Sequence, residues 1–568
     1  MSEQKPLDSI KKDARTWSVS DTTKDQIPAN RSSKAASSKR VSKRRQRRSL
    51  RAGLAVMGGR AAGALSRRLH LGGGTSIAGM VAQRLYPDIV EHLSTQLAYG
   101  SVLVTGTNGK TTTSGFIAAI LSDAGLRVWR NREGSNLMQG VAGALVIRAQ
   151  PDGNLRRTGQ AISIFEVDEA VMPQAVQILP PRVAVFTNLF RDQLDRFGEV
   201  DTVSKRWQQA IKLLPENTTL VLNADDPTTA HLSEYFTGQV VFFGIDDPSF
   251  DLAREGLAVE RHQVMDTRTC PYCGGEYVYS IQYYSHLGHY SCSQCKRERP
   301  KADVRAVKIV ADGFDRLRIQ IETRIQQGEI VIPLAGFYNV YNALAAISAS
   351  QALGINWEPI VSGIEQFKPA FGRGERVHVE GRTLRLLLAK NPTGFNEVLR
   401  TLFSDGIQRH VLFDLNDNIA DGQDISWIWD VDFERATHQL ATLTVAGTRA
   451  FDLALRLKHA GIEQEAMAIV NSNPLRAVKN VQESKAHNTR QSRRTRNKEA
   501  MRNTQDESTK NHKSTKTYGI SHALDTAIRQ TPSGETLFVI PTYTGLLEIH
   551  RELERRGLTP RYWEESGP

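Results

Sequence analysis

Short apolar runs recur between residues 101 and 245, and segments with helical spacing separate them. Such runs are typical of strands that are buried on both faces, and the alternation with helices is typical of a parallel sheet. The pattern predicts strands over residues 102–105, 162–167, 183–188, 219–223 and 240–244. We therefore expect an α/β fold with a doubly wound, mostly parallel sheet.

Further runs extend this prediction toward the C-terminus. Two strands are expected at residues 307–310 and 316–321, and the glycines at 371–375 indicate a hinge. Beyond them a second strand and helix series predicts a Rossmann-like domain. Its expected strands cover residues 384–388, 411–414, 443–446 and 537–540.

Charge separates the folded segments from the others. The chain has 568 residues and a net charge of +12, but residues 31–51 hold ten Lys or Arg and no acid. Residues 485–516 hold ten more against three acids, so the rest of the chain is near −5. Such stretches cannot form a core and are typical of solvated segments. The alternative is that they bind an anionic partner, either membrane headgroups or RNA.

These features predict an organisation in three parts. We expect a disordered basic tail over residues 1–50, a central domain over 51–369, and a C-terminal domain over 370–568 with a basic insert at 480–518. The first 30 residues lack the apolar segment of a secretory signal, and no apolar run is long enough to span a membrane. We therefore expect a cytoplasmic chain.

A phosphate-binding motif follows the first predicted strand. Gly106 and Gly109 bound the turn Gly-Thr-Asn-Gly and let its backbone approach an anion, and Lys110 adds a positive charge. Thr111 or Thr112 can place a hydroxyl on Mg²⁺. The full Walker spacing would require glycine at position 104, which is valine, so a glycine-rich turn with an exposed lysine is the alternative.

All four cysteines belong to one pattern. They form two C-x2-C pairs separated by 18 residues, the spacing of a zinc ribbon. Four thiolates make a closed tetrahedral site without an open position for water, so we expect structural zinc, with two disulfides as the alternative. The ligands are Cys270, Cys273, Cys292 and Cys295 in a ribbon over residues 266–300.

Six segments between residues 106 and 375 resemble the Mur ligases, which make amide bonds through acyl phosphates, and they occur in the family's order. Six ordered matches are more specific than any one of them. They are Gly106-Thr-Asn-Gly-Lys-Thr-Thr, Gly134-Ser-Asn136, Asn188 with Asp192-Gln-Leu-Asp195, Asn223-Ala-Asp-Asp226-Pro, Gly336-Phe-Tyr-Asn339-Val-Tyr-Asn342, and Gly372-Arg373-Gly-Glu375.

Within that family the chain resembles the MurT subfamily over about residues 60–560, apart from the two basic segments. The segment at 191–198, the internal ribbon, the loop at 390–396 and the aspartate-rich loop at 417–430 carry this resemblance. It implies a Mur ligase-like central P-loop ATPase domain with an inserted four-cysteine zinc ribbon, plus a Rossmann-like C-terminal domain.

The resemblance also implies a reaction, the ATP-dependent amidation of the D-glutamate α-carboxyl in the lipid II stem peptide. This would be a step of peptidoglycan biosynthesis with ATP, Mg²⁺ and structural zinc as cofactors. No cysteine lies outside the ribbon to serve as a nucleophile, so ammonia is expected from a separate GatD-like glutaminase subunit. Lipid II implies action at the inner membrane surface, and we expect no specific nucleic acid.

Site residues follow from the matched motifs. Phosphoryl transfer depends on positioning and charge neutralisation. These could be provided by Lys110, by Arg373 and by a Mg²⁺ that Thr111 and Glu166 hold. Asn339 and Asn342 resemble the family's adenine contacts. The expected ATP-binding residues are Gly106, Thr107, Asn108, Gly109, Lys110, Thr111, Thr112, Asn188, Asn339, Asn342 and Arg373.

Each assignment has a simpler competitor. Glu166 could be a solvated acid at a strand end, the two asparagines could be helix caps, and Arg373 could pair on the surface. The subfamily is thought to lend its partner's Cys/His pair an aspartate. Among the loop's aspartates we select Asp424, although polar loops commonly place aspartate at turns.

Two departures from the family pattern matter. Gln193 replaces the family's histidine, and the residues at 387–392 lack its acidic ribose contact. Both argue against an ordinary amino-acid-adding Mur ligase, which is one alternative. The other is a nucleic-acid-associated ATPase that uses the ribbon and the basic segments.

Overall fold

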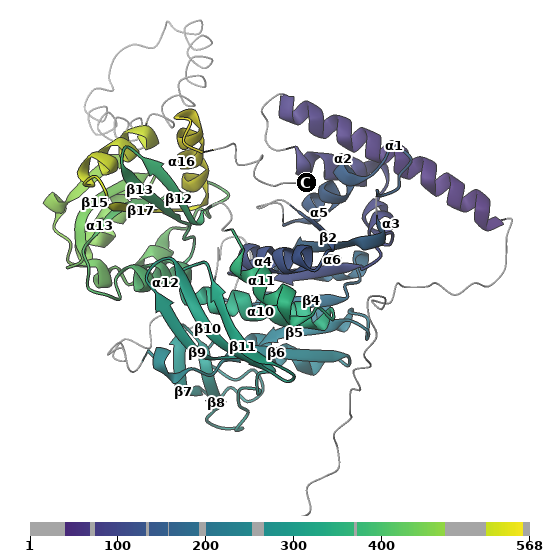
Figure 1. Cartoon of the computed structure of the whole chain (residues 1–568), viewed down its shortest axis with the longest axis horizontal. Helices are drawn as coiled ribbons and strands as arrows, with labels where there is room; N and C mark the ends of the chain where they lie inside the picture. Colours follow the sequence, from purple (N-terminus) through teal and green to yellow (C-terminus); the bar gives the residue numbers. More distant parts are fainter. Residues whose placement is uncertain are drawn as a thin grey trace, which may run out of the picture. The chain divides into compact units, whose positions relative to one another are not determined.

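The computed structural model describes residues 40–68, 74–131, 136–156, 158–191, 200–252, 266–368, 372–471 and 519–559. These residues form two large sheets with flanking helices and one separate hairpin (Figure 1). The larger sheet belongs to residues 101–332 and the smaller one to residues 373–541. The predicted boundary near residue 370 falls at the gap before the described residues resume at 372.

The larger sheet has nine strands, in the order β11-β10-β9-β6-β5-β4-β1-β3-β2. Neighbours from β2 to β9 are parallel, whereas β10 and β11 add antiparallel at one edge. The predicted α/β sheet is confirmed, but it is mixed. Its strands are β1 (Ser101–Thr105), β2 (Arg127–Arg130), β3 (Ala161–Glu166), β4 (Val183–Phe186), β5 (Thr219–Asn223), β6 (Gln239–Ile245), β9 (Val304–Asp312), β10 (Arg316–Thr323) and β11 (Gln327–Ile332).

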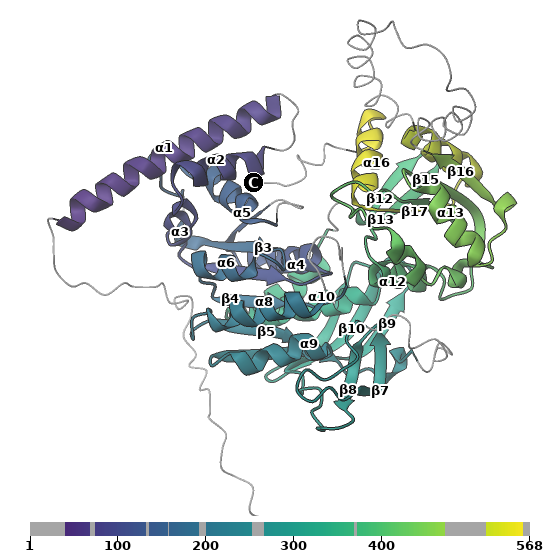
Figure 2. The ribbon, with the colours of Figure 1, turned by 180° about the vertical axis from the view of Figure 1, so that it is seen from behind.

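Helices cover both faces of this sheet (Figures 1 and 2). Successive residues of β1 alternate between two apolar cores, since Val102 and Val104 belong to one and Leu103 to the other. The first core includes residues of α4 (Lys110–Asp123), α10 (Tyr338–Ala352) and α11 (Trp357–Glu365). The second includes α5 (Met138–Arg148), α6 (Met172–Ile178) and α8 (Val200–Lys212). β1 is therefore buried on both sides, which explains its continuous apolar sequence.

Three helices precede the sheet, α1 (Arg40–Arg68), α2 (Thr75–Leu85) and α3 (Ile89–Ser94). The prediction of a disordered tail through residue 50 is wrong at its end, because α1 begins at Arg40. Residues 40–50 contain helix-favouring Arg, Lys and Gln and no Gly or Pro, so the helix extends beyond the part whose side chains form the core. No helix among the described residues is both long enough and apolar enough to cross a bilayer.

The cysteine-containing insert lies between β6 and β9. It contains the antiparallel hairpin of β7 (Tyr277–Tyr284) and β8 (Leu287–Cys292). The hairpin does not join the large sheet. The chain leaves the sheet at β6 and returns to the parallel neighbour β9, so the insert leaves the strand order intact.

The smaller sheet has six strands in the order β12-β13-β17-β14-β15-β16. All neighbours are parallel except β12 and β13. Its strands are β12 (Arg373–Val379), β13 (Arg382–Leu387), β14 (Arg409–Asp414), β15 (Leu440–Gly447), β16 (Met467–Asn471) and β17 (Thr536–Pro541). Its helices are α12 (Pro392–Leu402), α13 (Ala450–His459), residues 519–530 and α16 (Tyr543–Arg555).

The predicted basic insert lies outside the described residues, between β16 and the helix at 519–530. The described residues also include shorter helices. They are α9 (Pro227–His231), η1 (Thr158–Gln160), η2 (Leu232–Tyr235), η3 (Pro248–Phe250), η5 (Ser426–Asp430), η6 (Phe433–Ala436) and η7 (Gln464–Ala466).

Candidate active site

The glycine-bounded turn connects β1 directly to the N-terminus of α4, as its sequence predicts. Gly106 and Gly109 have φ values of 140° and 87°. A Cβ on Gly106 would lie 2.0 Å from Thr187 Oγ1, and one on Gly109 would lie 2.0 Å from Asn342 Oδ1. Neither position accepts a side chain, so the loop's shape depends on both glycines.

Lys110 lies in the first turn of α4 and points back over the loop. Its Nζ donates to the carbonyl oxygens of Gly106 and Thr107 and forms an ion pair with Glu169 Oε1 at 2.8 Å. The side chains of Lys110 and Glu169 are only 10% and 11% exposed. A cation at a helix N-terminus can exchange a carboxylate partner for a phosphate.

Glu166 is the last residue of β3, next to β1, and is 1% exposed. Thr111 Oγ1 donates to Glu166 Oε2 at 2.9 Å, and Ser114 Oγ donates to Glu166 Oε1 at 2.8 Å. Arg130 forms an ion pair with the same carboxylate at 3.4 Å. The alternative of a solvated strand-end acid is therefore wrong. The predicted pair of Thr111 and Glu166 is adjacent, and a hydroxyl beside a carboxylate suits Mg²⁺. Thr112 is buried in the same turn.

A second loop, after β4, supports the phosphate-binding turn. Asn188 Oδ1 accepts from the Asn108 backbone N–H at 2.9 Å, and Asn188 Nδ2 donates to the Asn108 carbonyl at 3.1 Å. Thr107 Oγ1 accepts from the Phe190 N–H at 2.9 Å and donates to its carbonyl. Asn188 thus holds the loop's backbone, and Thr107 joins the two loops.

Asn391 also contacts this turn, and the sequence prediction did not include it. The side-chain amides of Asn108 and Asn391 exchange hydrogen bonds of 3.4 and 3.1 Å. Asn391 is the N-cap of α12, where its Oδ1 accepts from the Gly394 N–H at 2.8 Å. The Asn-Pro pair at 391–392 is a helix-start signal in the sequence, but its contact with residue 108 depends on tertiary structure.

The two predicted asparagines of α10 are each 3% exposed, so they are not surface residues. Asn342 Nδ2 donates to Asn339 Oδ1 at 3.0 Å, and Asn339 Nδ2 donates to the Ala335 carbonyl at 2.6 Å. Because Asn342 Oδ1 lies against Gly109, these amides form a polar connection from the turn to Ala335.

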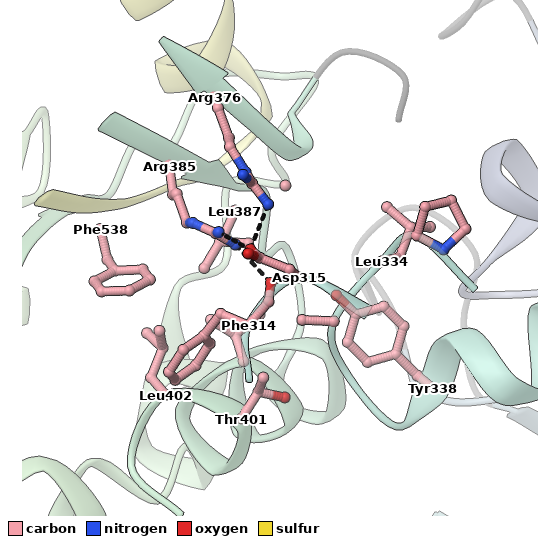
Figure 3. A pocket seen from close by; sticks show the side chains of 14 residues that line it. Phe314, Asp315, Leu334, Tyr338, Arg376, Arg385, Leu387, Thr401, Leu402 and Phe538 are labelled. Atoms are coloured by element: carbon pink, nitrogen blue, oxygen red, sulfur yellow. Dashed lines mark hydrogen bonds and ion pairs between the residues drawn. The ribbon is translucent and has the colours of Figure 1, made fainter. Parts of the chain in front are cut away.

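Ala335 lines a cavity of about 320 Å³ between the start of α10 and the smaller sheet (Figure 3). Asp315, in the β9–β10 turn, forms ion pairs with Arg376 and Arg385. Burial opposes ionisation, but the two guanidinium groups hold the pKa of Asp315 below its usual value. The remaining wall is largely apolar, with Phe314, Pro333, Leu334, Tyr338, Gly374, Leu387, Val398, Thr401, Leu402 and Phe538. Such a volume and lining suit a flat heterocycle.

The four cysteines converge, as their spacing predicts, although they come from both ends of the hairpin. Their Sγ atoms all lie within 4.8 Å of one another. Cys270 and Cys295 sulfurs are 3.7 Å apart, and Cys273 and Cys292 sulfurs are 3.4 Å apart. Tetrahedral zinc with bonds of about 2.3 Å requires sulfurs about 3.8 Å apart, whereas a disulfide requires about 2.05 Å. The cluster fits zinc, and the thiols are free.

The hairpin is linked to the phosphate-binding turn through His286. This buried ring lies in the β7–β8 turn, with Nε2 3.4 Å from Asp226 Oδ1 and its centroid 5.0 Å from that of Phe190. Asp226 Oδ2 accepts from the Leu189 N–H at 2.8 Å. Burial favours the neutral acid, but His286 and these hydrogen bonds hold the pKa of Asp226 below its usual value.

We expect Cys292→Ser to lose the bound metal and to lower the free energy of unfolding by about 2 kcal/mol or more, since a closed structural site adds its binding energy to folding. Elemental analysis would measure the zinc content and thermal denaturation the stability. Ser293→Ala, on the neighbouring exposed residue, is the matched control. Zinc retained at the wild-type level would contradict the assignment.

The aspartates of the 417–430 loop have different environments. Asp417 binds Arg449 and Thr448, Asp421 binds Thr544, and Asp430 forms an ion pair with Arg191. Asp424 is exposed, and its Oδ1 accepts from the Ser426 N–H at 2.8 Å, which lowers its pKa. It is therefore the aspartate of this set that a second protein could reach most easily.

Several predicted positions lie outside the described part of the chain. They include Gly134 and the segment with Asp192, Gln193 and Asp195. Arg373 is the first residue of β12, but its side chain is not described. The glycine-rich stretch predicted as a hinge therefore opens a strand, with positive φ at Gly372 and Gly374.

The chain is similar to proteins of a known family. Residues 104–290 match the family model of the Mur ligase middle domain, and residues 388–493 match that of the MurT ligase C-terminal domain. In solved structures, a pseudomurein peptide ligase type C from Methanothermus fervidus is similar with a TM-score of 0.54 and 19% identity, covering 80% of this chain and 79% of that one. MurF from Acinetobacter baumannii is similar with a TM-score of 0.53 and 18% identity, covering 84% and 80%. Both show the Mur ligase fold.

A curated relative is similar along most of its length. The chain is 34% identical over 393 residues to the lipid II isoglutaminyl synthase (glutamine-hydrolyzing) subunit MurT of Staphylococcus aureus (strain COL), which covers 69% of this chain and 84% of the relative. The similarity spans both sheets, and the phosphate-binding turn, the Thr111–Glu166 pair and the aspartate-rich loop lie within the matched models. The chain therefore belongs to the MurT family of Mur ligase-like proteins.

Proposed function

We propose that this chain is the synthetase subunit of a lipid II isoglutaminyl synthase, a ligase that converts the D-glutamate α-carboxyl of the stem peptide to a carboxamide. The observation that carries the proposal is the phosphate-binding turn, with Lys110 at 10% side-chain exposure beside buried Glu166, in a chain of the MurT family. A turn of this kind indicates that the protein binds a nucleotide. The family indicates which molecule accepts the phosphoryl group. The product would be D-isoglutamine in peptidoglycan biosynthesis.

ATP binding is supported at two places that the side chains of two asparagines connect. The triphosphate would lie over residues 106–112, where Lys110 exchanges Glu169 for phosphate oxygens and the N-terminus of α4 offers backbone N–H groups. The adenine would enter the cavity beside Ala335, which the Asn342–Asn339 amides link to Gly109. Thr111 and Glu166 would hold Mg²⁺, which when bound neutralises phosphate charge.

Two bond exchanges complete the reaction. A carboxylate oxygen attacks the γ-phosphorus, ADP leaves, and an acyl phosphate forms. The lone pair of ammonia then attacks the acyl carbon, inorganic phosphate leaves with the C–O bond electrons, and the nitrogen loses a proton. Lys110 and Arg373 would stabilise the charge that develops on the transferred phosphoryl oxygens. A zinc ion held by the four cysteines would have a structural role, since four thiolates leave no open position.

A GatD-like glutaminase subunit would supply the ammonia, since the sequence offers no cysteine outside the ribbon. The loop at 417–430 is the proposed contact, and Asp424 the residue that orients the partner's catalytic histidine. Its exposure and its ionised state at neutral pH support this. The ion pair of Arg191 with Asp430 ties this loop to the segment after Asn188.

We expect Asp424→Asn to lower glutamine hydrolysis by the complex at least about tenfold, because an amide no longer orients or stabilises a partner imidazolium. Amidation driven by free ammonium should stay within about twofold of wild type, since the P-loop is unchanged. Both rates would be measured on the assembled complex. Asp452→Asn, on α13 with its side chain 45% exposed, is the matched control. Unchanged glutamine hydrolysis would remove the assignment.

Mass spectrometry of lipid II tests the function itself. The purified chain would be incubated with lipid II, ATP, Mg²⁺ and concentrated ammonium, with parallel reactions that offer free amino acids. Conversion of one carboxyl to a carboxamide by ammonium is the expected result. An amino-acid adduct would instead show an amino-acid-adding ligase. ATP binding without any product, even after a glutaminase subunit is added, would overturn the proposal.

A further inference from the structure

Helix α1 has apolar residues on two opposite faces. One face is buried, where Ala52, Ala55 and Val56 are inaccessible and glycines replace larger residues. A Cβ on Gly59 would lie 2.6 Å from the Ala78 carbonyl oxygen of α2, so the two helices pack backbone to backbone. Figure 1 shows α1, in purple, lying along α2. This face holds α1 on the body of the protein.

The opposite face is exposed. Leu50, Leu54, Met57 and Leu65 have exposed fractions of 68%, 63%, 46% and 58%. Their spacing of four, three and eight residues places them within one stripe of about 80° on the helix. Leu85 of α2 is 56% exposed and lies beside the stripe, since a Cβ on Gly58 would be 2.7 Å from its Cδ1. Single exposed apolar residues need no explanation, but a continuous stripe does.

The charge of α1 identifies the kind of surface that the stripe fits. The helix contains ten Lys or Arg residues and no acidic residue, and seven of the ten lie within residues 40–51. Arg51, Arg67 and Arg68 are exposed on the part whose side chains are described. A partner must therefore offer apolar contact to the stripe and negative charge around it.

We propose that α1 is a membrane-surface helix, which inserts its exposed leucine and methionine stripe at the acyl boundary of an anionic bilayer while its arginines contact lipid headgroups. An interfacial helix lies in the membrane plane, and 29 residues span about 44 Å. The proposal deepens the proposed function, on which it rests for its physiological meaning, because a lipid-linked substrate is presented at such a surface.

The anionic bilayer is a better occupant than a protein for two reasons. Apolar area alone or charge alone gives marginal membrane binding, but the two together give stable association, and α1 combines them. The ten charges share one sign, so a second copy of this chain would place like charges against each other. The basic segment that precedes α1 adds charge of the same sign.

Vesicle flotation with the full-length chain tests this directly. We expect binding to vesicles of phosphatidylcholine with phosphatidylglycerol, and at least tenfold weaker binding to phosphatidylcholine alone. The triple variant Leu54→Gln, Met57→Gln, Leu65→Gln should lose on the order of tenfold in affinity for the anionic vesicles. Ile325→Gln, at an 83% exposed apolar residue far from α1 in sequence, is the matched control and should bind as wild type does.

Two further measurements keep the outcomes distinct. Circular dichroism would show that the triple variant is folded, and amidation of a short-chain, water-soluble lipid II analogue should stay at the wild-type rate. Flotation needs no catalysis, so failure of the proposed function would leave this test valid. Wild-type binding by the triple variant, or no binding by the wild type, would overturn the proposal. The proposal would also be overturned if the wild type and the control variant formed a dimer or a glutaminase complex and the triple variant did not.

Discussion

Lys110→Met should lower kcat/KM for ATP-dependent amidation by at least about a thousandfold, which would be the largest effect of any single change in the site. Phosphoryl transfer depends almost entirely on positioning and electrostatic stabilisation, and Lys110, with its side chain 10% exposed, is the cation of the loop. Methionine keeps the length of the side chain but supplies neither charge nor donors. It also leaves the buried residue Glu169 without this cation.

Ammonium-driven amidation of lipid II would measure this loss, because ammonium makes the result independent of any glutaminase. Lys458→Met is the matched control, since Lys458 is exposed on α13 and distant in sequence from the loop. Thermal denaturation of both variants would separate lost chemistry from lost folding. Activity of Lys110→Met within tenfold of wild type would contradict the assigned role.

The fold could be predicted where sequence and burial have a simple relation. β1 and β5 are buried on both faces and have continuous apolar sequences, and both were found. β2 and β12 were missed because edge strands carry charges, as Arg127–Arg130 shows with arginine at both ends. The start of α1 was missed because charge was taken as disorder, although arginine favours helix.

The site divides in a similar way. Gly106, Lys110 and the cysteines act within short motifs, so spacing alone located them. Arg130 and Glu169 form ion pairs with Glu166 and Lys110, respectively, and Ser114 donates a hydrogen bond to Glu166. These three residues lie in different parts of the sequence and form no motif. Asn391 lies 283 residues from its partner Asn108. Such contacts depend on the tertiary structure, which no local pattern contains.

Asp414 is a buried acid that belongs to none of the sequence motifs. Asp414 ends β14 and is 2% exposed, and neither carboxyl oxygen has a hydrogen-bond partner among the described residues. Gly447 and Gly545 approach it so closely that a Cβ would lie 2.6 Å from Oδ1 and 2.3 Å from Oδ2, respectively. Burial, followed by the negative charges of Glu548 and Asp421, raises the pKa of Asp414 to about 8.

Asp414→Asn should therefore stabilise the protein increasingly as pH rises. The folded state keeps the proton up to pH about 8, whereas the unfolded state releases it above the ordinary value of 3.8. Between these two pKa values the free energy of unfolding of the wild type falls by about 1.4 kcal/mol for each pH unit. Asparagine does not titrate, so the variant does not lose this stability. The stability difference between variant and wild type should grow by about 2 kcal/mol from pH 6 to 7.5.

Urea denaturation at several pH values would measure this difference, with Asp452→Asn on α13, whose side chain is 45% exposed, as the matched control. Only a group that keeps its proton in the folded state and releases it in the unfolded state gives a negative slope of stability against pH in this range. Because the variant and the wild type share every other titrating group, those groups cancel in the comparison. A difference that stays constant from pH 6 to 7.5 would show that Asp414 is already ionised, and a polar partner for its carboxylate would then be required.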